Sequence, residues 1–221
     1  MIEFDLVQQR GGRYSMGVRA VSLGSAYLNT LDLRTEAHDV LVRLAEESGE
    51  TVHLMVYSEG QVVYLDKIAG RSPIQMASRI GDRAPVHCTA SGKAMLAHLP
   101  EAELDRLLAA GLAARTENTI TEPERLRAEL DRIRESGYAV DDIENEYDIR
   151  CVSAPVFDSM GHVAAAISAS GPAVRVGEKT QELAALMMSG ATQLSERLGA
   201  SSQLSPGLSS VSSGQTERNF V

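Results

Sequence analysis

The stretch ETVHLMVYSEGQVVYLDKI, residues 50–68, decides the fold class. Its side chains alternate in character over residues 51–57 and again over 61–68, and the turn-forming sequence Ser58-Glu59-Gly60 separates the two runs. Alternation is typical of β-strands, and two strands joined by so short a turn pair antiparallel. The sequence therefore predicts a β-hairpin at this point.

Amphipathic segments lie on both sides of this hairpin in the sequence. Residues 33–48 predict a helix, because Val40, Leu41 and Leu44 share a helical face and Gly49 supplies an end. Further helices are expected after Thr89 to about residue 98 and at 101–110, 122–136 and 178–198, with strands at 138–141, 149–157, 163–170 and within 71–80. Since strands and helices do not alternate regularly, we expect an α+β fold with an antiparallel sheet flanked by helices.

The composition limits the class of protein. The chain has 221 residues, 43% of them hydrophobic, which suffices for one or two domains with a core, whereas aromatic residues make up only 4%. A net charge of -9 does not favour binding nucleic acid with the whole surface. Cys88 and Cys151 lack metal-type spacing, and we find no secretory signal and no apolar run of membrane-spanning length. We therefore expect a reduced, cytoplasmic protein without membrane association.

The segment HCTASGKAML, residues 87–96, looks like the end of a phosphate-binding P-loop but does not complete the motif. The first glycine of a P-loop would stand at His87, and Ala94 replaces the hydroxyl residue that would hold Mg²⁺. What remains is a polar turn that precedes an apolar helix. Such a helix start can bind a small anion, although a capped surface helix is the simpler interpretation.

Small side chains dominate one face of the strand predicted at residues 163–170. By alternation one face carries Val163, Ala165, Ile167 and Ala169, and the other carries Ala164, Ala166, Ser168 and Ser170. The first face is ordinary core. The second leaves volume that the strand does not fill, which favours equally a close-packed helix or a ligand cavity with two hydroxyls at its wall.

Two further features allow both a structural and a functional interpretation. Cys151, which shares a strand face with Ile149 and Ser153, is most simply a small core residue; as a nucleophile it would need a base, and no triad is identifiable. The acidic segment DDIENEYDI, residues 141–149, is most simply a solvated loop, unless one acid turns inward to accept a ligand hydroxyl. A metal site would draw on Asp141, Glu144, Glu146 and a histidine, but no histidine spacing supports it. We expect neither a metal nor a cofactor.

Taken in order, four blocks resemble the IclR family of bacterial transcriptional regulators over residues 12 to about 198. GGRYSMGVRAVSLGSAYL resembles the end of a winged helix-turn-helix with a linker helix, and ETVHLMVYSEGQVVYLDKI resembles the first hairpin of the effector domain. RIGDRAPVHCTASGKAMLAHLP resembles its central turn and helix, and GYAVDDIENEYDIRCVSAPVFDSMGHVAAAISASGP its closing strands. The combined order is far more specific than any single block.

The resemblance implies a GAF-like effector domain that binds a small organic acid or sugar acid and is not an enzyme. Its sheet would be six-stranded, antiparallel and flanked by helices, with the ligand carboxylate at the amides of a turn and polar groups of the closing strands around the rest. The residues implied are the effector-binding Ala90, Ser91, Asp141, Cys151, Ser168 and Ser170 and the pocket-wall residues Met76, Ala84 and Ile149. No catalytic residue is implied.

The same resemblance divides the chain into four parts. Residues 1–16 would be a remnant of the wing, 17–32 the linker helix, 33–199 the effector-binding domain and 200–221 a Ser-rich disordered tail. The helix-turn-helix is largely absent, and the arginines between Gln8 and Arg19 are too few for specific DNA readout. We expect this chain to bind effector as a homodimer or homotetramer, and operator DNA to be bound only through a helix-turn-helix that this chain lacks.

The ligand class and two rival functions stay open. The segment YLDKIAGRSPIQMASRIG resembles the family branch that responds to sugar-derived keto acids, and the absence of aromatic residues near the site blocks argues against an aromatic acid. One rival is a small enzyme that uses Cys151 with Asp141 and His87. The other is a dimerisation module with a vestigial pocket.

Overall fold

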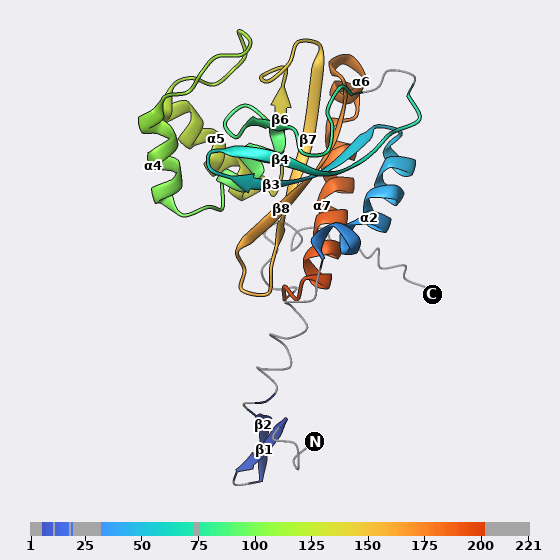
Figure 1. Cartoon of the computed structure of the whole chain (residues 1–221), viewed down its shortest axis with the longest axis vertical. Helices are drawn as coiled ribbons and strands as arrows, with labels where there is room; N and C mark the ends of the chain where they lie inside the picture. Colours follow the sequence, from blue (N-terminus) through green and yellow to red (C-terminus); the bar gives the residue numbers. More distant parts are fainter. Residues whose placement is uncertain (1–5, 11, 18, 20–31, 73–75, 202–221) are drawn as a thin grey trace, which may run out of the picture.

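The computed structural model describes residues 6–10, 12–17, 19, 32–72 and 76–201. The predicted linker helix (17–32) and Ser-rich tail (200–221) lie almost entirely outside the described residues. Near the N-terminus, β1 (Val7–Arg10) and β2 (Arg13–Met16) form an antiparallel hairpin within the segment that the resemblance implies is a wing remnant (Figure 1). The interpretation of this hairpin as a wing remains a prediction.

A six-stranded sheet forms the centre of the fold (Figure 1). Its strands are β3 (Thr51–Ser58), β4 (Gln61–Ile68), β5 (Arg83–Pro85), β6 (Ala139–Asp142), β7 (Ile149–Phe157) and β8 (Val163–Pro172). They lie in the order β5-β4-β3-β8-β7-β6, and each neighbouring pair is antiparallel. The predicted hairpin is β3–β4, and β3 also pairs with β8, so the first and last strands of the sheet in sequence meet at its middle.

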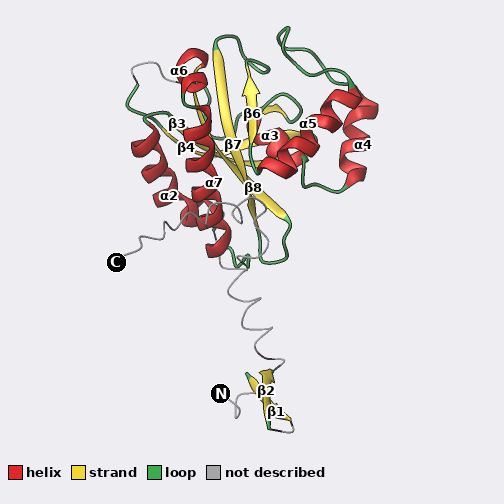
Figure 2. Cartoon of the chain, turned by 180° about the vertical axis from the view of Figure 1, so that it is seen from behind, coloured by secondary structure: helices red, strands yellow, loops and turns green. Residues whose placement is uncertain are grey.

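Helices cover both faces of the sheet (Figure 2). One face, called the α2 face, carries α2 (Leu33–Ser48), α6 (Ala173–Glu178) and α7 (Thr180–Arg197). The other, called the α3 face, carries α3 (Ala90–Leu96), α4 (Glu101–Ala110) and α5 (Pro123–Ser136). Alternation along β3 sends Leu54 into the core under α2 and Met55 into the core under α3. The expected α+β class, with helices flanking an antiparallel sheet, is confirmed.

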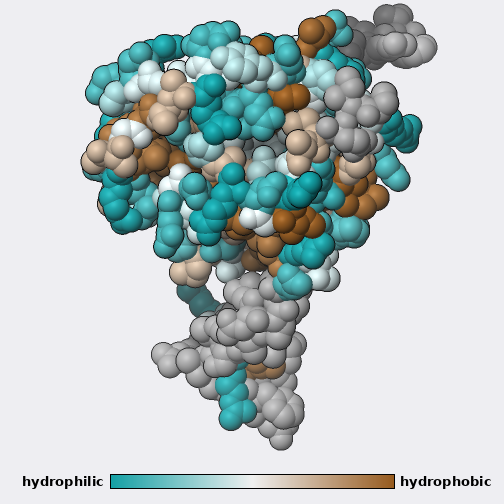
Figure 3. Space-filling view, turned by 45° about the horizontal axis from the view of Figure 1, so that its top comes forward, coloured by the Kyte–Doolittle hydropathy of each residue, from teal (hydrophilic) through white to brown (hydrophobic). Residues whose placement is uncertain are grey.

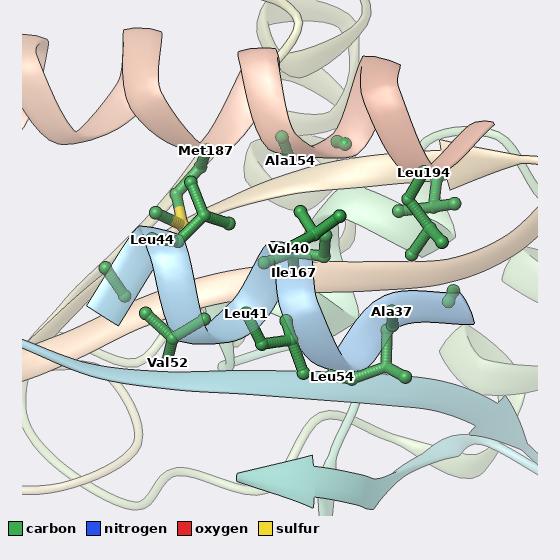
Figure 4. Packing of buried hydrophobic residues seen from close by; sticks show 14 of the residues in the cluster. Ala37, Val40, Leu41, Leu44, Val52, Leu54, Ala154, Ile167, Met187 and Leu194 are labelled. Atoms are coloured by element: carbon green, nitrogen blue, oxygen red, sulfur yellow. The ribbon is translucent and has the colours of Figure 1, made fainter. Parts of the chain in front are cut away.

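The larger core lies between the sheet and the pair α2–α7 (Figure 4). Leu41 and Leu44 of α2, Leu54 of β3, Ile167 of β8 and Met187 of α7 are all fully buried in it. Burial of each such side chain stabilises the fold by about 1.5–3 kcal/mol. This packing fixes the position of β8, whose opposite face carries the serines discussed below.

Local cap residues mark the helix boundaries. Asp32 begins α2, where its carboxylate accepts a hydrogen bond from the amide of Arg34 at 3.1 Å, and Gly49 ends the helix at a φ of 72°. Pro123 occupies the first turn of α5, and Gly137 follows that helix at a φ of 79°. A side-chain N-cap contributes about 1 kcal/mol, and a glycine adopts positive φ without a steric penalty.

Two predicted elements differ from the structure. No strand occurs among the described residues of 71–80; β5 follows this segment instead. The Lys67 ammonium donates to the carbonyls of Met76 at 2.6 Å and Ser78 at 2.7 Å, so these two carbonyls are hydrogen-bonded by a side chain and not by a neighbouring strand. The closing helix predicted at 178–198 begins at Thr180 instead, because Lys179, at φ -115° and ψ 13°, separates it from α6, an additional helix that was not predicted.

The predicted faces of β8 hold from Ala165 onward and are reversed before it. Phe157 pairs with Val163 and Val156 pairs with Ala165, so Ala164 is an extra residue at a β-bulge. A bulge inverts the alternation. Val163 consequently packs in the core of the α3 face, and Ala164 packs against the core of the α2 face, the opposite of the prediction.

Hydrophilic residues cover most of the face shown in Figure 3, and hydrophobic residues appear there as small separate patches. The large hydrophobic side chains most exposed among the described residues include Met160 and Val174, at 75% and 78%. Isolated exposed hydrophobic residues of this kind are ordinary on a protein surface.

Candidate functional site

A small cavity lies on the α3 face, between the sheet and the start of α3. Its lining comes from β3, β4, β6, β7, β8, the segment between β4 and β5, the start of α3 and the loop after β6, namely His53, Met55, Tyr64, Met76, Thr89, Ala90, Ser91, Asp141, Asn145, Glu146, Ile149, Cys151, Ser168 and Ser170. The cavity volume is about 20 Å³, which is room for about one water molecule. A larger molecule must therefore widen the cavity or extend beyond it.

Eight of the nine site residues named from the sequence line this cavity: Met76, Ala90, Ser91, Asp141, Ile149, Cys151, Ser168 and Ser170. The exception is Ala84, which does not line this cavity. Ala84 lies in β5 opposite Val62 of β4, and that pairing turns it into the core and toward a neighbouring cleft. Because β5 was not predicted, its register could not be either.

The start of α3 closes one end of the cavity. The Thr89 hydroxyl caps the helix by accepting a hydrogen bond from the amide of Gly92 at 3.2 Å, and it donates to the carbonyl of Pro85 at 2.9 Å. The first amides of the helix, those of Ala90 and Ser91, have no acceptor within the helix itself. A Cβ on Gly92 would lie 2.1 Å from the carbonyl oxygen of Val86, so the glycine is needed for close backbone packing and not for binding phosphate.

Hydroxyl groups connect α3 to the sheet beneath it. The Ser153 hydroxyl donates to the carbonyl of Ile167 at 2.8 Å and lies 3.1 Å from the Ser91 hydroxyl, which then acts as the donor to Ser153. Ser168 pairs with Ser153 across β7–β8, and Ser170 pairs with Cys151. The small face of β8 therefore borders both a helix and a cavity, and the two interpretations of that face hold together.

His53, missed by sequence reasoning, forms part of the floor of the cavity. Its Nε2 lies 2.8 Å from the Ser78 hydroxyl, and its Nδ1 lies 3.4 Å from the Ser170 hydroxyl. Burial, with a smaller contribution from the charge of Lys67, lowers the pKa of His53 to about 3, so the ring is neutral at physiological pH. Its position opposite Ser168 in the β3–β8 ladder is the signal that would have found it.

Asp141, at the end of β6, is the buried acid that lines the cavity. It is 2% exposed, and its Oδ1 accepts hydrogen bonds from the amides of Glu144 at 2.7 Å and Asn145 at 3.3 Å. Burial, followed by the charge of Glu144, raises its pKa to about 7, although these amides and the charge of Lys93 act in the opposite direction. Asp141 can therefore hold a proton, and donate a hydrogen bond, near neutral pH.

Lys93, which suggested a P-loop, serves an internal ion network. It is 1% exposed, and its ammonium contacts the carboxylates of Glu144 and Glu129, the latter at 3.3 Å. Glu129 also binds Arg132 of α5 at 2.8 Å. The charge of Lys93 is thus neutralised within the protein.

The enzyme interpretation finds no support in the arrangement of its residues. Burial, with the charge of Asp141, raises the pKa of Cys151 well above its ordinary value, so its thiol stays protonated and is a poor nucleophile. The Nε2–H of His87, the base in that interpretation, donates to the carbonyl oxygen of Ala113 at 3.0 Å. Within the described part of the chain, no group of three or more His, Cys, Asp or Glu residues is arranged to hold a metal ion.

Tyr64 contradicts the expectation that aromatic residues are absent from the site. A β-bulge at Leu65 shifts the β3–β4 register between Leu54 and Met55, so that Tyr64 and Lys67 lie on the same face. The Tyr64 ring meets the His53 ring edge to face, with centroids 5.0 Å apart. Simple alternation would have separated Tyr64 from Lys67, which is why the sequence did not place the tyrosine here.

A cavity lined by hydroxyls, helix amides and a buried acid is typical of a site that binds a small polar ligand. Figure 1 shows the sheet enclosed by helices, and no helix among the described residues is long and apolar enough to cross a membrane.

Comparisons with known proteins identify the family. Residues 25–196 match the family model described as bacterial transcriptional regulator IclR, C-terminal. The chain is 37% identical over 189 residues to the HTH-type transcriptional regulator KdgR of Escherichia coli, a match that spans 85% of this chain and 72% of KdgR. The crystal structure of Thermotoga maritima IclR matches with a TM-score of 0.73 at 40% identity, over 90% of this chain and 81% of that one. The crystal structure of the C-terminal domain of E. coli KdgR has a TM-score of 0.68 at 36% identity, over 76% of this chain and 99% of that one.

The chain therefore belongs to the IclR family of bacterial transcriptional regulators and carries the effector-binding domain of that family. The prediction that it is a regulator and not an enzyme is confirmed by these relatives.

Proposed function

We propose that this chain is the effector-binding and oligomerisation part of an IclR-type regulator and that it senses a small organic acid, in particular a sugar-derived or keto acid. The observation that carries the proposal is that eight of the residues implied by the family resemblance line one cavity. They come from separate segments of the chain, and in combination they offer amide donors, hydroxyls and a titratable acid.

The chemistry of the lining supports an acid as the ligand. The amides of Ala90 and Ser91 suit a carboxylate, since the start of a helix carries partial positive charge. A protonated Asp141 can donate a hydrogen bond to the ligand, and Ser168 and Ser170 can bind a keto or hydroxyl oxygen. We therefore assign Ala90, Ser91, Asp141, Cys151, Ser168 and Ser170 to effector binding, with Met76 and Ile149 as apolar walls.

The small size of the cavity supports a sensing role. With room for about one water molecule, it accepts an acid only if the surrounding segments move apart or the acid reaches outward. A ligand that binds the wider form better shifts the population toward that form. Where the surrounding segments move apart, ligand binding and conformational change are linked.

The remaining parts of the proposal concern partners. We propose that the chain forms a homodimer or homotetramer in the cytoplasm, that the β1–β2 hairpin is the wing of a winged helix-turn-helix, and that operator DNA is bound through helices that residues 1–16 do not supply. Sedimentation equilibrium checks the first point; a monomer at micromolar concentration would contradict it.

A thermal-shift screen against small carboxylic, keto and sugar acids tests the central proposal. A ligand at about 100 times its Kd stabilises the fold by roughly 2.7 kcal/mol, which is readily measured. Asp141→Ala and Ser168→Ala should each reduce the shift, whereas Arg106→Ala, on the exposed side of α4, should not. If no acid shifts the wild-type protein, the proposal is wrong and the dimerisation module with a vestigial pocket becomes the better description.

A further inference from the structure

A loop between α4 and α5 holds the backbone that directly follows Asp141. Side chains of this loop, residues 115–119, donate a hydrogen bond to each of four consecutive carbonyls. In chain order the acceptors are Asp142, Ile143, Glu144 and Asn145, and the donors are Asn118 Nδ2 at 3.0 Å, Thr116 Oγ1 at 2.6 Å, Thr119 Oγ1 at 2.6 Å and Arg115 Nε at 3.1 Å. Both threonines are buried. The orientation of residues 142–145 is therefore fixed from one side by this loop.

Two of these carbonyls belong to the peptide groups whose amides bind Asp141. The peptide group before Glu144 accepts a hydrogen bond from Thr116 at 2.6 Å, and its amide donates to Asp141 Oδ1 at 2.7 Å. The peptide group before Asn145 accepts from Thr119 at 2.6 Å, and its amide donates to the same oxygen at 3.3 Å. A peptide group is planar, and in the trans form its C=O and N–H point in opposite directions. Each threonine therefore aims one amide at the acid by holding the carbonyl at the other end of a rigid group.

The backbone between the threonines and the acid is strained. Ile143 has a φ of 60°, in the left-handed region that β-branched residues rarely enter. A residue in such a conformation persists only where surrounding contacts hold it. Without the Thr116 hydroxyl, the carbonyl of Ile143 would lose this donor and the strained residue could relax. The amides that follow would then move away from Asp141.

We propose that Thr116 and Thr119 are positioning residues of the candidate effector site, which hold two backbone amides on the carboxyl of Asp141 through the intervening peptide groups. The inference rests on the proposed function, because Asp141 is there assigned to effector binding. Neither threonine lines the cavity, so both act on a ligand only through Asp141. The assignment extends the site to a loop that no ligand in the cavity would touch.

The pKa of Asp141 in the free protein reports the position of these amides. Amides that donate to a carboxylate stabilise its charged form, and here they oppose the burial that raises this pKa to about 7. Thr116→Val keeps the shape of the side chain and removes the hydroxyl. It should raise the pKa further, by about one pH unit, since one hydrogen bond to a charged group changes an equilibrium about tenfold. Thr119→Val should raise it less, because its peptide group makes the longer contact with Asp141, at 3.3 Å.

Carbon-13 NMR of the whole chain, with labelled aspartate carboxyls and Asp141→Asn to assign the resonance, measures this pKa. Thr116→Ser and Thr119→Ser keep the hydroxyl and should leave the pKa unchanged. Thr180→Val is the matched control, because it removes a hydroxyl that donates to the carbonyl of Val176 at 3.0 Å, at the start of α7 on the α2 face.

The variants leave the titratable groups around Asp141 in place. Those whose charges act on Asp141, or respond to its charge, are Lys93 of α3, Glu144, Tyr64 of β4, Cys88 and Cys151 of β7. His53 and Glu146 line the same cavity. A change of pKa in the threonine variants therefore reports the loss of the hydroxyl and the movement of the backbone that it holds.

Acid binding provides a second readout that a purely structural role would not move. With a pKa of about 7, the protonated fraction of Asp141 falls roughly tenfold between pH 6 and pH 8, and pyruvate affinity should fall with it. In Thr116→Val, with a pKa near 8, about half of Asp141 is still protonated at pH 8, so the fall should be only about twofold. Isothermal titration with pyruvate at the two pH values measures this ratio.

The outcomes separate this inference from the function on which it rests. It is overturned if folded Thr116→Val titrates as wild type does, or if Thr116→Ser or Thr180→Val raises the pKa as much as Thr116→Val. Should Thr116→Val not fold, Thr119→Val and Asn118→Ala, the latter at an exposed position, must both raise the pKa; wild-type titration in both would equally overturn it. If no small acid binds the folded wild-type protein, the proposed function fails, whereas the titration of Asp141 in the free chain still decides whether the threonines position its amides.

Discussion

Binding of a carboxylate effector should weaken as the pH rises through 7, because the buried Asp141 must then give up its proton or oppose a second negative charge. Two carboxylates about 4 Å apart repel by about 4 kcal/mol at an effective dielectric constant near 20. A repulsion of this size exceeds the cost of keeping Asp141 protonated, since each pH unit above its pKa of about 7 costs about 1.4 kcal/mol. The acid should therefore bind together with a proton.

The magnitude follows from the fraction of Asp141 that is protonated in the free protein. With a pKa of about 7, that fraction is about 0.9 at pH 6 and about 0.1 at pH 8, so the affinity for pyruvate or a related acid should fall roughly tenfold over this range. Proton uptake should be about one half at pH 7 and approach one at pH 8. Isothermal titration in buffers of different ionisation enthalpy measures both quantities.

Two variants complete this test. Asp141→Asn keeps an oxygen for the amides of Glu144 and Asn145 and removes the titration, so binding should become independent of pH and proton uptake should vanish. Asp142→Asn removes the same charge at the next, exposed position and should keep the wild-type dependence. Wild-type binding that is constant from pH 6 to pH 8, with no proton uptake, would refute the reasoning.

Other predictions concern stability and the start of α3. The folded-state pKa of Asp141 lies above its unfolded value of 3.8, so its ionisation destabilises the fold progressively from about pH 4 to pH 7. Asp141→Asn should therefore be more stable than wild type at pH 8 by up to about 4 kcal/mol, with little difference at pH 4, as measured by urea unfolding. Gly92→Ala should destabilise by about 3 kcal/mol or more through its clash with Val86, and a loss below 1 kcal/mol would contradict that contact. Ser91→Pro, which deletes an amide donor, should weaken acid binding by about 1.5–3 kcal/mol relative to Ser91→Ala, and equal affinities would exclude the amide from binding. Lys93→Met should cost about 3–5 kcal/mol in thermal unfolding by leaving Glu144 unpaired, and pairing it with a Glu144→Gln change should recover most of the loss.

The features that the sequence predicted are those controlled by neighbouring residues. The bounds of α2 follow from Asp32, Gly49 and a hydrophobic stripe, and the β3–β4 hairpin follows from alternation around a short turn. The cap at Thr89 is likewise local. Site residues on these elements could be predicted because the family resemblance implies their roles and the helices and strands occur in the expected order along the chain.

The features that the sequence missed depend on contacts between distant segments. The path of residues 76–82 is set by hydrogen bonds from Lys67, and nothing in residues 71–80 themselves indicates it. Bulges at Leu65 and Ala164 each invert a strand face, which brought Tyr64 into the site and exchanged the sides of Val163 and Ala164. The pKa of Asp141 likewise reflects burial by the whole domain and cannot be read from a loop of five acids.

Strand β8, in the middle of the sheet, contributes both to the candidate effector site and to the larger hydrophobic core. Ile167 of β8 packs in the core beneath α2 and α7 (Figure 4), and Ala169 belongs to the same core. Ser168 and Ser170, which alternate with them along the strand, line the cavity on the opposite face. A ligand that displaces these serines also displaces β8, whose other face packs in the hydrophobic core. Closely packed interiors transmit such displacements. The cavity and α2 lie on opposite faces of the sheet, and β8 connects them directly. Ile167→Val should therefore reduce the conformational response to ligand more than it reduces the affinity for ligand.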